Sequence, residues 1–434
     1  MSRGKDMKRI GVILFALVLA TFALSGCKAQ EQYVKLDQKN FPDWSLYSAL
    51  KGLDYDQDSK LSQSEIESAT SISLYWVNDL TGLDTFTNLE TIYIREGKNL
   101  KCDFNNFTNL KTLNIEGTFE SNQIDLSGNT NLESIYIKSE NLEELVLPEG
   151  APLKEICIES TLLKGIDLNS YKGLTKIEIE SNELMTELSF QDFPELTELT
   201  CSSNSKLNNL NVSNCPKLKV LECTFDIYTF EGTSSNLTNL DISDCENIEE
   251  FRCRGNKSLT SLNLSSFPKL TELDCSYNNL TKLDISRCPE LTELSCVENT
   301  LTSLDLSSTP KLNYLACAGN SLNELDVSCC PDIKTLVCWS CNLTNLNISG
   351  CSKIVFINCE ENKLSSLDIS GCQEINGLHC GRNALTSLDI SKCPKLVNLI
   401  NTTGSYVNKD GDLVYRDEEG KAAIYIDNGV ELVK

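Results

Sequence analysis

The segment LTKLDISRCPELTELSCVENT at 280–300 is followed directly by LTSLDLSSTPKLNYLACAGNS at 301–321, and the two match position by position. Seven such copies keep one register, and each starts with a leucine, at positions 259, 280, 301, 322, 343, 364 and 385. A repeat this short cannot bury its own apolar face and has to stack on its neighbours. This stretch therefore predicts an elongated repeat solenoid with one coil for each copy.

The apolar residues of each copy follow a fixed spacing. Residues 291–301 have the pattern L-x-x-L-x-C-x-x-N-x-L, which is that of leucine-rich repeats with cysteine in one leucine position. Leu294 and Cys296 are expected to alternate inward on a short strand, so that the residues beside them point outward. The segment 283–286 (LDIS) is expected to form the other wall of the coil.

In these residues the chain resembles the leucine-rich repeats of bacterial surface proteins, especially the 21-residue, cysteine-bearing repeats of internalin J and of leucine-rich lipoproteins. The resemblance implies a leucine-rich-repeat horseshoe of parallel β-strands. The inward position can be followed from Ile94 to Asn401, which predicts about fifteen coils. The expected segments are a lipoprotein signal peptide (1–26), a tether (27–40), a small helical N-terminal cap (41–79), the repeats (80–403) and a β C-terminal cap (404–434).

The N-terminus has the features of a secretory signal. Lys8 and Arg9 precede an apolar run at 10–24, which is too short to span a membrane as a helix. The following Leu-Ser-Gly-Cys resembles a bacterial lipobox, and this resemblance implies that Cys27 is lipidated. The alternative is an ordinary signal with a chance cysteine. We therefore expect a cell-surface protein, held outside the cell membrane by a lipid anchor.

Residues 54–65 (DYDQDSKLSQSE) resemble the calcium-binding loop of an EF-hand. That resemblance implies carboxylate ligands from Asp54, Asp56, Asp58 and Glu65 and a backbone carbonyl from Lys60, a set of oxygens that suits Ca²⁺. The sequence departs from the EF-hand pattern at position 59, where serine replaces the usual glycine, and we expect weaker affinity rather than none. A single loop of this kind favours a structural calcium ion in the N-terminal cap over a paired sensor, and a loop that keeps its shape without metal is the alternative.

Charge and cysteine content narrow the classes of function. The formal net charge of −24 argues against nucleic acid as a partner, because phosphate binding needs a basic surface. The 21 cysteines fall largely into two columns. One fills the inward strand position at 201, 223, 253, 275, 296, 317, 338, 359 and 380, and the other lies at 215, 245, 288, 330, 351, 372 and 393. We interpret both as small buried hydrophobic residues, although disulfides between stacked coils remain geometrically possible.

Nothing in the sequence indicates an enzyme. The chain has one histidine, His379, so a nucleophile–histidine pair has a single candidate base. Cys338 and Cys341 have the spacing of a redox motif, but Cys338 belongs to the first cysteine column and Cys341 takes the asparagine position of the repeat.

The outward residues of the strands predict two kinds of surface on the concave face. The N-terminal part is acidic, with Glu155, Glu159, Glu178, Glu180, Glu198, Glu222, Glu250, Glu272, Asp274 and Glu293. Further along, Tyr314, Val337, Trp339 and Phe356, with His379 beside them, form the predicted centre of a partner-binding patch. The alternative is that these side chains only pack against one another across strands.

Two further features stay open at this stage. An aspartate recurs at 284, 305, 326, 368 and 389, and either hydrogen bonds from nearby hydroxyl groups or a row of cations would offset the repulsion. Residues 225–235 insert into one coil as a loop, which is either a contact site or a tolerated exposed insertion.

The sequence thus predicts a monomeric surface lipoprotein that binds another protein or a glycan through the concave face of its repeats. The rival interpretation is a structural spacer with no specific ligand. A spacer would have a uniformly polar concave face, which the residues around Trp339 contradict.

Overall fold

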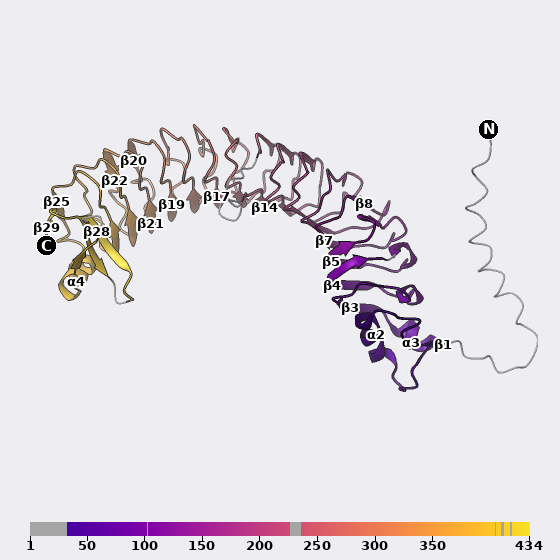
Figure 1. Cartoon of the computed structure of the whole chain (residues 1–434). Coiled ribbons are helices and arrows are strands. Elements are labelled where there is room, and N and C mark those ends of the chain that lie inside the picture. The colour runs from indigo at the N-terminus through magenta and orange to yellow at the C-terminus, as the bar shows by residue number, and fades with distance from the viewer. Residues whose placement is uncertain (1–32, 102, 226–235, 404, 409–411, 417–418) are drawn as a thin grey trace, which may run out of the picture.

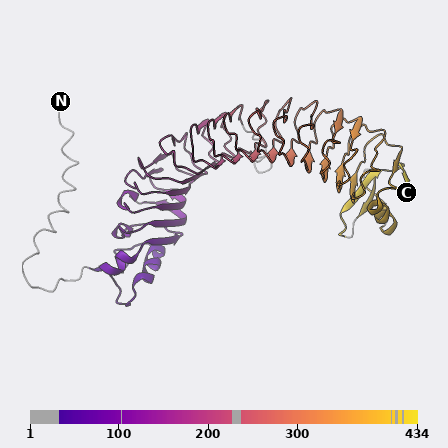
Figure 2. The same ribbon diagram turned by 180° about the vertical axis from the view of Figure 1, so that it is seen from behind.

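The computed structural model describes residues 33–434 except 102, 226–235, 404, 409–411 and 417–418. Fifteen parallel strands in this part of the chain form one continuous row, each paired with the strand one repeat later. The row forms the inner side of an arch (Figures 1 and 2). It comprises β3 (Ser71–Tyr75), β4 (Thr91–Leu100), β5 (Thr112–Phe119), β7 (Ser134–Lys138), β9 (Glu155–Glu159), β10 (Lys176–Glu180), β12 (Glu198–Thr200), β14 (Val220–Glu222), β16 (Glu250–Arg252), β17 (Glu272–Asp274), β18 (Glu293–Ser295), β19 (Tyr314–Ala316), β21 (Thr335–Val337), β23 (Phe356–Asn358) and β24 (Gly377–His379).

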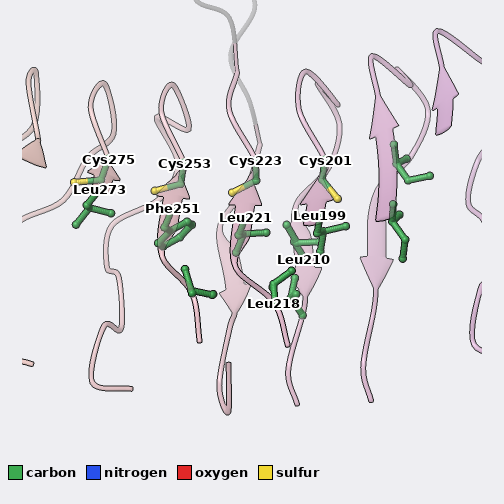
Figure 3. Close-up of a cluster of buried hydrophobic side chains, with 14 of the residues drawn as sticks. Leu199, Cys201, Leu210, Leu218, Leu221, Cys223, Phe251, Cys253, Leu273 and Cys275 are labelled. Carbon is green, nitrogen blue, oxygen red and sulfur yellow. The ribbon is translucent and has the colours of Figure 1, made fainter. Parts of the chain in front are cut away.

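The inward positions build the core as the repeat pattern predicts. Leu294 of β18 pairs in register with Leu315 of β19, and both are fully buried. Cys296, two positions further along, is buried as well, and so are the other eight cysteines of its column. Figure 3 shows how these residues stack from coil to coil: Leu221 and Cys223 lie beside Phe251 and Cys253 of the next coil. Two-residue alternation on a short strand thus accounts for the whole inner wall.

The asparagine position ties neighbouring coils together. Asn299 Nδ2 donates to the carbonyl of Cys296 in its own coil (3.1 Å) and to that of Cys275 in the preceding coil (3.0 Å). Cys341 occupies this position in its own repeat, and its sulfur donates to the carbonyl of Cys317 at 3.1 Å. The prediction that Cys341 replaces the asparagine of the repeat is therefore confirmed.

The second cysteine column does more than fill space. All seven of its members are buried as expected. Several thiols also donate to a carbonyl of the preceding coil, for example Cys245 to Val212 at 3.0 Å and Cys351 to Val327 at 3.3 Å. Interpreting this column as purely hydrophobic was incomplete, because its weak S–H donors satisfy buried backbone acceptors. The cysteines that the structure describes are all free thiols.

The other wall of the coils is only partly regular. Its short strands are β6 (Gln123–Asp125), β8 (Glu144–Val146), β11 (Glu187–Ser189), β13 (Asn209–Asn211), β15 (Asn239–Asp241), β20 (Glu324–Asp326), β22 (Asn345–Asn347) and β25 (Ser387–Asp389). The segment 283–286 is not a strand, although Leu283 and Ile285 are buried in the wall as predicted. The arch widens toward its outer side, so strand hydrogen bonding is less continuous in this wall than in the inner row (Figure 1).

The N-terminal end differs from the predicted boundaries in two places. Residues 33–40 do not form a free tether, because β1 (Tyr33–Lys35) pairs antiparallel with β2 (Lys60–Ser62) and supplies the partner that this short strand needs. The strand β3 lies within the predicted cap (41–79), but it pairs in parallel with β4 and begins the row. Between them lie α2 (Trp44–Leu50), the 3₁₀ turn η1 (Lys51–Leu53) and α3 (Gln63–Ser68). Two further 3₁₀ turns, η2 (Leu83–Thr85) and η3 (Phe104–Asn106), lie in the first coils.

At the other end the predicted last inward position, Asn401, was wrong. It lies in the helix α4 (Pro394–Thr402), which starts with a proline at its first position and buries Leu396 and Ile400 at helical spacing. The strand that pairs with β24 is instead β28 (Ala422–Asp427), and β29 (Glu431–Val433) pairs with β25. The strands β26 (Ser405–Val407) and β27 (Asp412–Arg416) complete an antiparallel extension of the inner sheet.

Candidate functional site

The loop between α2 and β2 brings three predicted metal ligands together. One carboxylate oxygen from each of Asp54, Asp56 and Asp58 lies within 4.8 Å of the others. The loop is held in shape from inside, because Asp54 accepts the amides of Asp58 (3.0 Å) and Ser59 (3.1 Å). Ser59 has a φ of 62°, the left-handed conformation in which glycine costs least, so the departure from the EF-hand pattern lies at a strained residue. This geometry offers hard oxygen donors to a cation such as Ca²⁺.

The other two predicted ligands, Glu65 and Lys60, make hydrogen bonds within the protein. Glu65 accepts the amide of Tyr55 with one oxygen (2.8 Å) and both the amide and the hydroxyl of Ser62 with the other (2.8 Å each), closing a capping box on α3. These hydrogen bonds lower the pKa of Glu65, those from Ser62 most. The Lys60 ammonium lies 3.2 Å from Asp58, whose carboxylate raises the pKa of this lysine. The residues therefore fit a cation through the three aspartates, with Glu65 at the closing end of the loop.

Strand pairing places the predicted aromatic patch on neighbouring strands of the inner row. Tyr314 of β19 stands in one column with Phe356 of β23, with Thr335 of β21 between them. Val337 stands in the next column, between Ala316 and Asn358. All four patch residues, including Trp339 just beyond β21, are half-buried on the outward side of the row. The structure thus brings them onto one surface, but as a spread group rather than a single ring cluster.

His379 contacts aromatic rings on both neighbouring strands. Its ring stands edge-on to Phe356, with centroids 5.3 Å apart, and 6.0 Å from the ring of Tyr425. Its Nδ1 lies 3.6 Å from a carboxylate oxygen of Glu360. Gly377 leaves room for Phe356, since a Cβ there would stand 2.6 Å from the ring. This part of the patch includes genuine cross-strand packing, which the alternative interpretation anticipated.

Two sets of aromatic residues were missed from the sequence. Tyr425 contacts His379 only because β28 pairs with β24, and the repeat pattern does not predict this pairing. At the opposite end of the row, Trp44, Tyr75 and Trp76 are 69%, 46% and 67% exposed. The outward position of Tyr75 could have been found from the alternation in 71–75 (SISLY), had that segment been read as a strand.

In the aspartate column (284, 305, 326, 368 and 389), hydrogen bonds from neighbouring serines offset the repulsion between the carboxylates. Asp284 accepts the amide of Ser286 (3.0 Å), and Asp326 accepts both the amide and the hydroxyl of Ser328 (2.9 and 2.6 Å). These bonds lower the pKa of both aspartates. Each aspartate therefore closes a local turn. Within the described residues, only the 54–58 loop gathers three possible metal ligands in this way.

The carboxylates of the inner row contrast with those of a second row. We define the entry rim as the residues three positions before each inner strand from β12 onward, together with Lys395. These are Glu195, Lys217, Asn247, Lys269, Glu290, Lys311, Asp332, Lys353, Glu374 and Lys395. Apart from the neutral Asn247, the entry rim alternates acids and lysines, so that Glu290 accepts from Lys311 (2.5 Å) and Glu374 from Lys395 (2.7 Å), one repeat later in each case. At the first positions of the inner strands, a lysine stands between two glutamates at β10, where Lys176 pairs with Glu198 (3.7 Å), but this alternation does not continue to β16, β17 and β18.

Those first positions instead stack like charges. Glu250, Glu272 and Glu293 stand side by side on three successive strands, and Tyr314 follows them. Arg252 bridges Glu250 (2.9 Å) and Glu272 (2.8 Å). No residue in the described part of the chain forms an ion pair with Glu293. The inner row therefore carries unpaired negative charge next to the aromatic patch.

Two predicted features fall outside the described residues. These are the lipidation site Cys27, and the inserted loop 225–235 apart from Phe225, which is buried. In the part of the chain that the structure does describe, no helix is both long and apolar enough to cross a bilayer.

Fold and surface together define this chain as a leucine-rich-repeat β-solenoid. Its structure is similar to the functional domain of InlJ from Listeria monocytogenes, which includes a cysteine ladder (TM-score 0.57, 19% identity, 92% of this chain and 99% of that one). It is also similar to a leucine-rich-repeat protein of Leptospira interrogans (TM-score 0.57, 17% identity, covering 76% and 89%). A third similar structure is the leucine-rich effector YopM of Yersinia pestis (TM-score 0.51, 20% identity, covering 79% and 88%). No protein-family model and no curated protein sequence matches the chain.

Proposed function

We propose that this chain is a lipid-anchored cell-surface protein that binds another protein, or a glycan, through the concave face of its repeats. The binding centre comprises Tyr314, Val337, Trp339 and Phe356, with His379 at its edge. The anchor is the lipidated Cys27, and a calcium ion held by the 54–65 loop stabilises the first turns of the solenoid.

The observation that carries the proposal is the half-exposed aromatic group on the inner strands. Trp339 has no hydrogen-bond partner for its indole N–H among the described residues, and its side chain is half-buried on the same outward surface as Val337 and Phe356. Aromatic side chains of this kind are the usual anchors of protein interfaces, because they bury a large area and still offer a polar atom. A rigid concave sheet also presents such residues at low cost in entropy.

The competing function, a spacer that holds another molecule away from the membrane, is favoured by the packing of His379. In that case Phe356, His379 and Tyr425 would simply close the C-terminal end of the inner sheet. A spacer leaves Trp339 unexplained, since its outward ring contributes no ring contact to that closure.

The test compares two double variants of the full chain. Trp339→Ala/Phe356→Ala removes the centre of the patch, and Trp44→Ala/Trp76→Ala removes two exposed indole rings at the other end of the arch. Capture of labelled surface proteins and of arrayed glycans is measured with both, after their melting temperatures have been shown to match. Loss with the first variant alone supports the proposal. Loss with the second alone moves the site to the N-terminal aromatics, and no capture by the unmodified chain favours the spacer.

A further inference from the structure

The carboxylates near Tyr314 give this part of the concave face a negative charge. Glu293 on β18 stands directly beside Tyr314 on β19, and Asp274 lies one strand further away, on β17. Both carboxylates raise the pKa of the tyrosine after the larger effect of burial. Neither carboxylate forms an ion pair with any described residue. Two negative charges and an aromatic ring thus share one outward surface, which continues directly into the aromatic patch.

The rest of the chain indicates that this arrangement is not a general property of an acidic protein. On the entry rim, three residues before the same strands, charges alternate, and Glu290 pairs with Lys311. A lysine at the first position of β19 would stand beside Glu293 and relieve the repulsion among the glutamates, but this position is occupied by Tyr314. Like charges on adjacent strands cost stability. This stability cost is present in the inner row at Glu272 and Glu293, whereas the ion pairs of the rim remove it there.

Further toward the N-terminus the same surface shows the electrostatic consequence. Glu180 stands at the end of β10, half-buried, and its pKa is raised by burial first and then by Glu178, Glu159 and Glu222. A positively charged group supplied from outside would reverse this penalty. Glu159 and Glu178 have lysine partners on this face, whereas Glu180, Asp274 and Glu293 have no ion-pair partner among the described residues. The carboxylates without a partner therefore favour a partner that carries positive charge.

We propose that the partner is a protein whose contacting segment is cationic, and that a lysine or arginine of this segment lies between Asp274, Glu293 and the ring of Tyr314. This inference rests on the proposed function, since it names the partner class of the same concave face. The two carboxylates provide the charge, and the tyrosine ring adds a cation–π contact. Polyanionic glycans are disfavoured at this surface for the same reason.

The experiment uses a peptide display library as the probe and the purified full-length chain in mild detergent as the target. Enriched peptides are expected to carry Lys or Arg, and their affinity is expected to fall as salt rises. Asp274→Asn/Glu293→Gln is expected to weaken the best peptide about tenfold, whereas Glu290→Gln/Glu374→Gln on the entry rim changes affinity less than about twofold. The two variants have equal net charge, so a general electrostatic effect would weaken both alike and would overturn the inference.

The remaining outcomes separate this inference from the proposed function. If the enriched peptides lack cationic residues but still need Trp339 and Phe356, the concave face is the binding site and the charge assignment is wrong. If the library yields no binder that depends on either pair of residues, the proposed function fails as well.

Discussion

The entry rim lies three residues before the first positions of the inner strands, yet around β16, β17 and β18 the two rows differ in how their charges are arranged. The rim alternates acids and lysines except at Asn247, a neutral residue whose side-chain oxygen accepts a hydrogen bond from Lys269. Its acids and lysines pair between coils, as Glu195 does with Lys217 and Glu290 with Lys311. The inner row places Glu250, Glu272 and Glu293 on consecutive strands. Repetition by itself therefore does not produce the unpaired charge, because the same copies that neutralise the rim leave the inner row acidic.

This comparison teaches where stability and binding are separated in a solenoid. Residues on the rim contact the next coil and are arranged to favour stacking. Residues on the inner row face outward, so a partner can supply what the chain lacks. Four measurements can break or sharpen this distinction.

The largest effect is expected at the 54–58 loop, where three aspartates gather. If Ca²⁺ binds there, free calcium at 100 times the dissociation constant should stabilise the folded chain by about 2.7 kcal/mol. The measurement is the melting temperature with calcium and with a chelator. Asp56→Asn should abolish the gain, while Glu67→Gln, on the exposed side of α3, should keep it. An identical response of both variants would show that calcium acts elsewhere.

A smaller effect is expected for Arg252→Ala. Arg252 is the cation that bridges Glu250 and Glu272, and its loss leaves two stacked carboxylates beside Asp274. We expect a destabilisation of about 1–2 kcal/mol in urea unfolding. Lys311→Ala on the rim should cost less than about 1 kcal/mol, because that pair is more exposed. Equal costs would mean that the inner row and the rim do not differ in stability.

Glu180 should respond to pH in the opposite direction to Glu361. The pKa of Glu180 in the folded state is raised above its ordinary 4.5. The folded state therefore loses stability as pH rises from 4.5 through the raised pKa. Glu180→Gln should therefore be more stable than the unmodified chain at pH 7, by less than about 1 kcal/mol, and should lose this advantage below pH 4.5.

Glu361 provides the matched control. Hydrogen bonds from Ser340 and then Arg382 lower its pKa, so its stabilising contribution is present above its ordinary 4.5 and is lost as pH falls through the lower folded value. Glu361→Gln should therefore be less stable at pH 7. The same sign for both variants in parallel melts would contradict the assignment.

The smallest effect is expected at a single rim pair. Glu195→Lys places two lysines together at Lys217 and should cost about 0.5 kcal/mol at low salt. The double exchange Glu195→Lys/Lys217→Glu should recover that loss, and 1 M salt should remove the difference. Failure of the double exchange to recover stability would show that the alternation on the rim is not a pairing device.

The repeat register was predictable because the same positions of every copy have to be buried against the neighbouring coils. Leu294, Cys296 and Asn299 occupy fixed positions, and the structure confirms their burial and the asparagine hydrogen bonds. The ends were less predictable, since a terminal coil lacks one neighbour. There β1 pairs with β2, β3 opens the row, and Asn401 lies in α4 instead of on a strand.

The candidate site was predictable in part for the same reason. Alternation on the strands placed Tyr314, Val337 and Phe356 on the outward face, as found. It could not place Tyr425, which reaches His379 only through the return of β28, nor Trp44, which comes from a helix outside the repeats.

The sequence by itself determined the solenoid, its core positions and the charge of its concave face, because these follow from a two-residue alternation repeated at a constant period. Only the tertiary structure decided which charges are paired. An ion pair depends on the distance between side chains of neighbouring coils, and the lysines of the rim come within reach of their acids while no cation of the described chain comes within reach of Glu293.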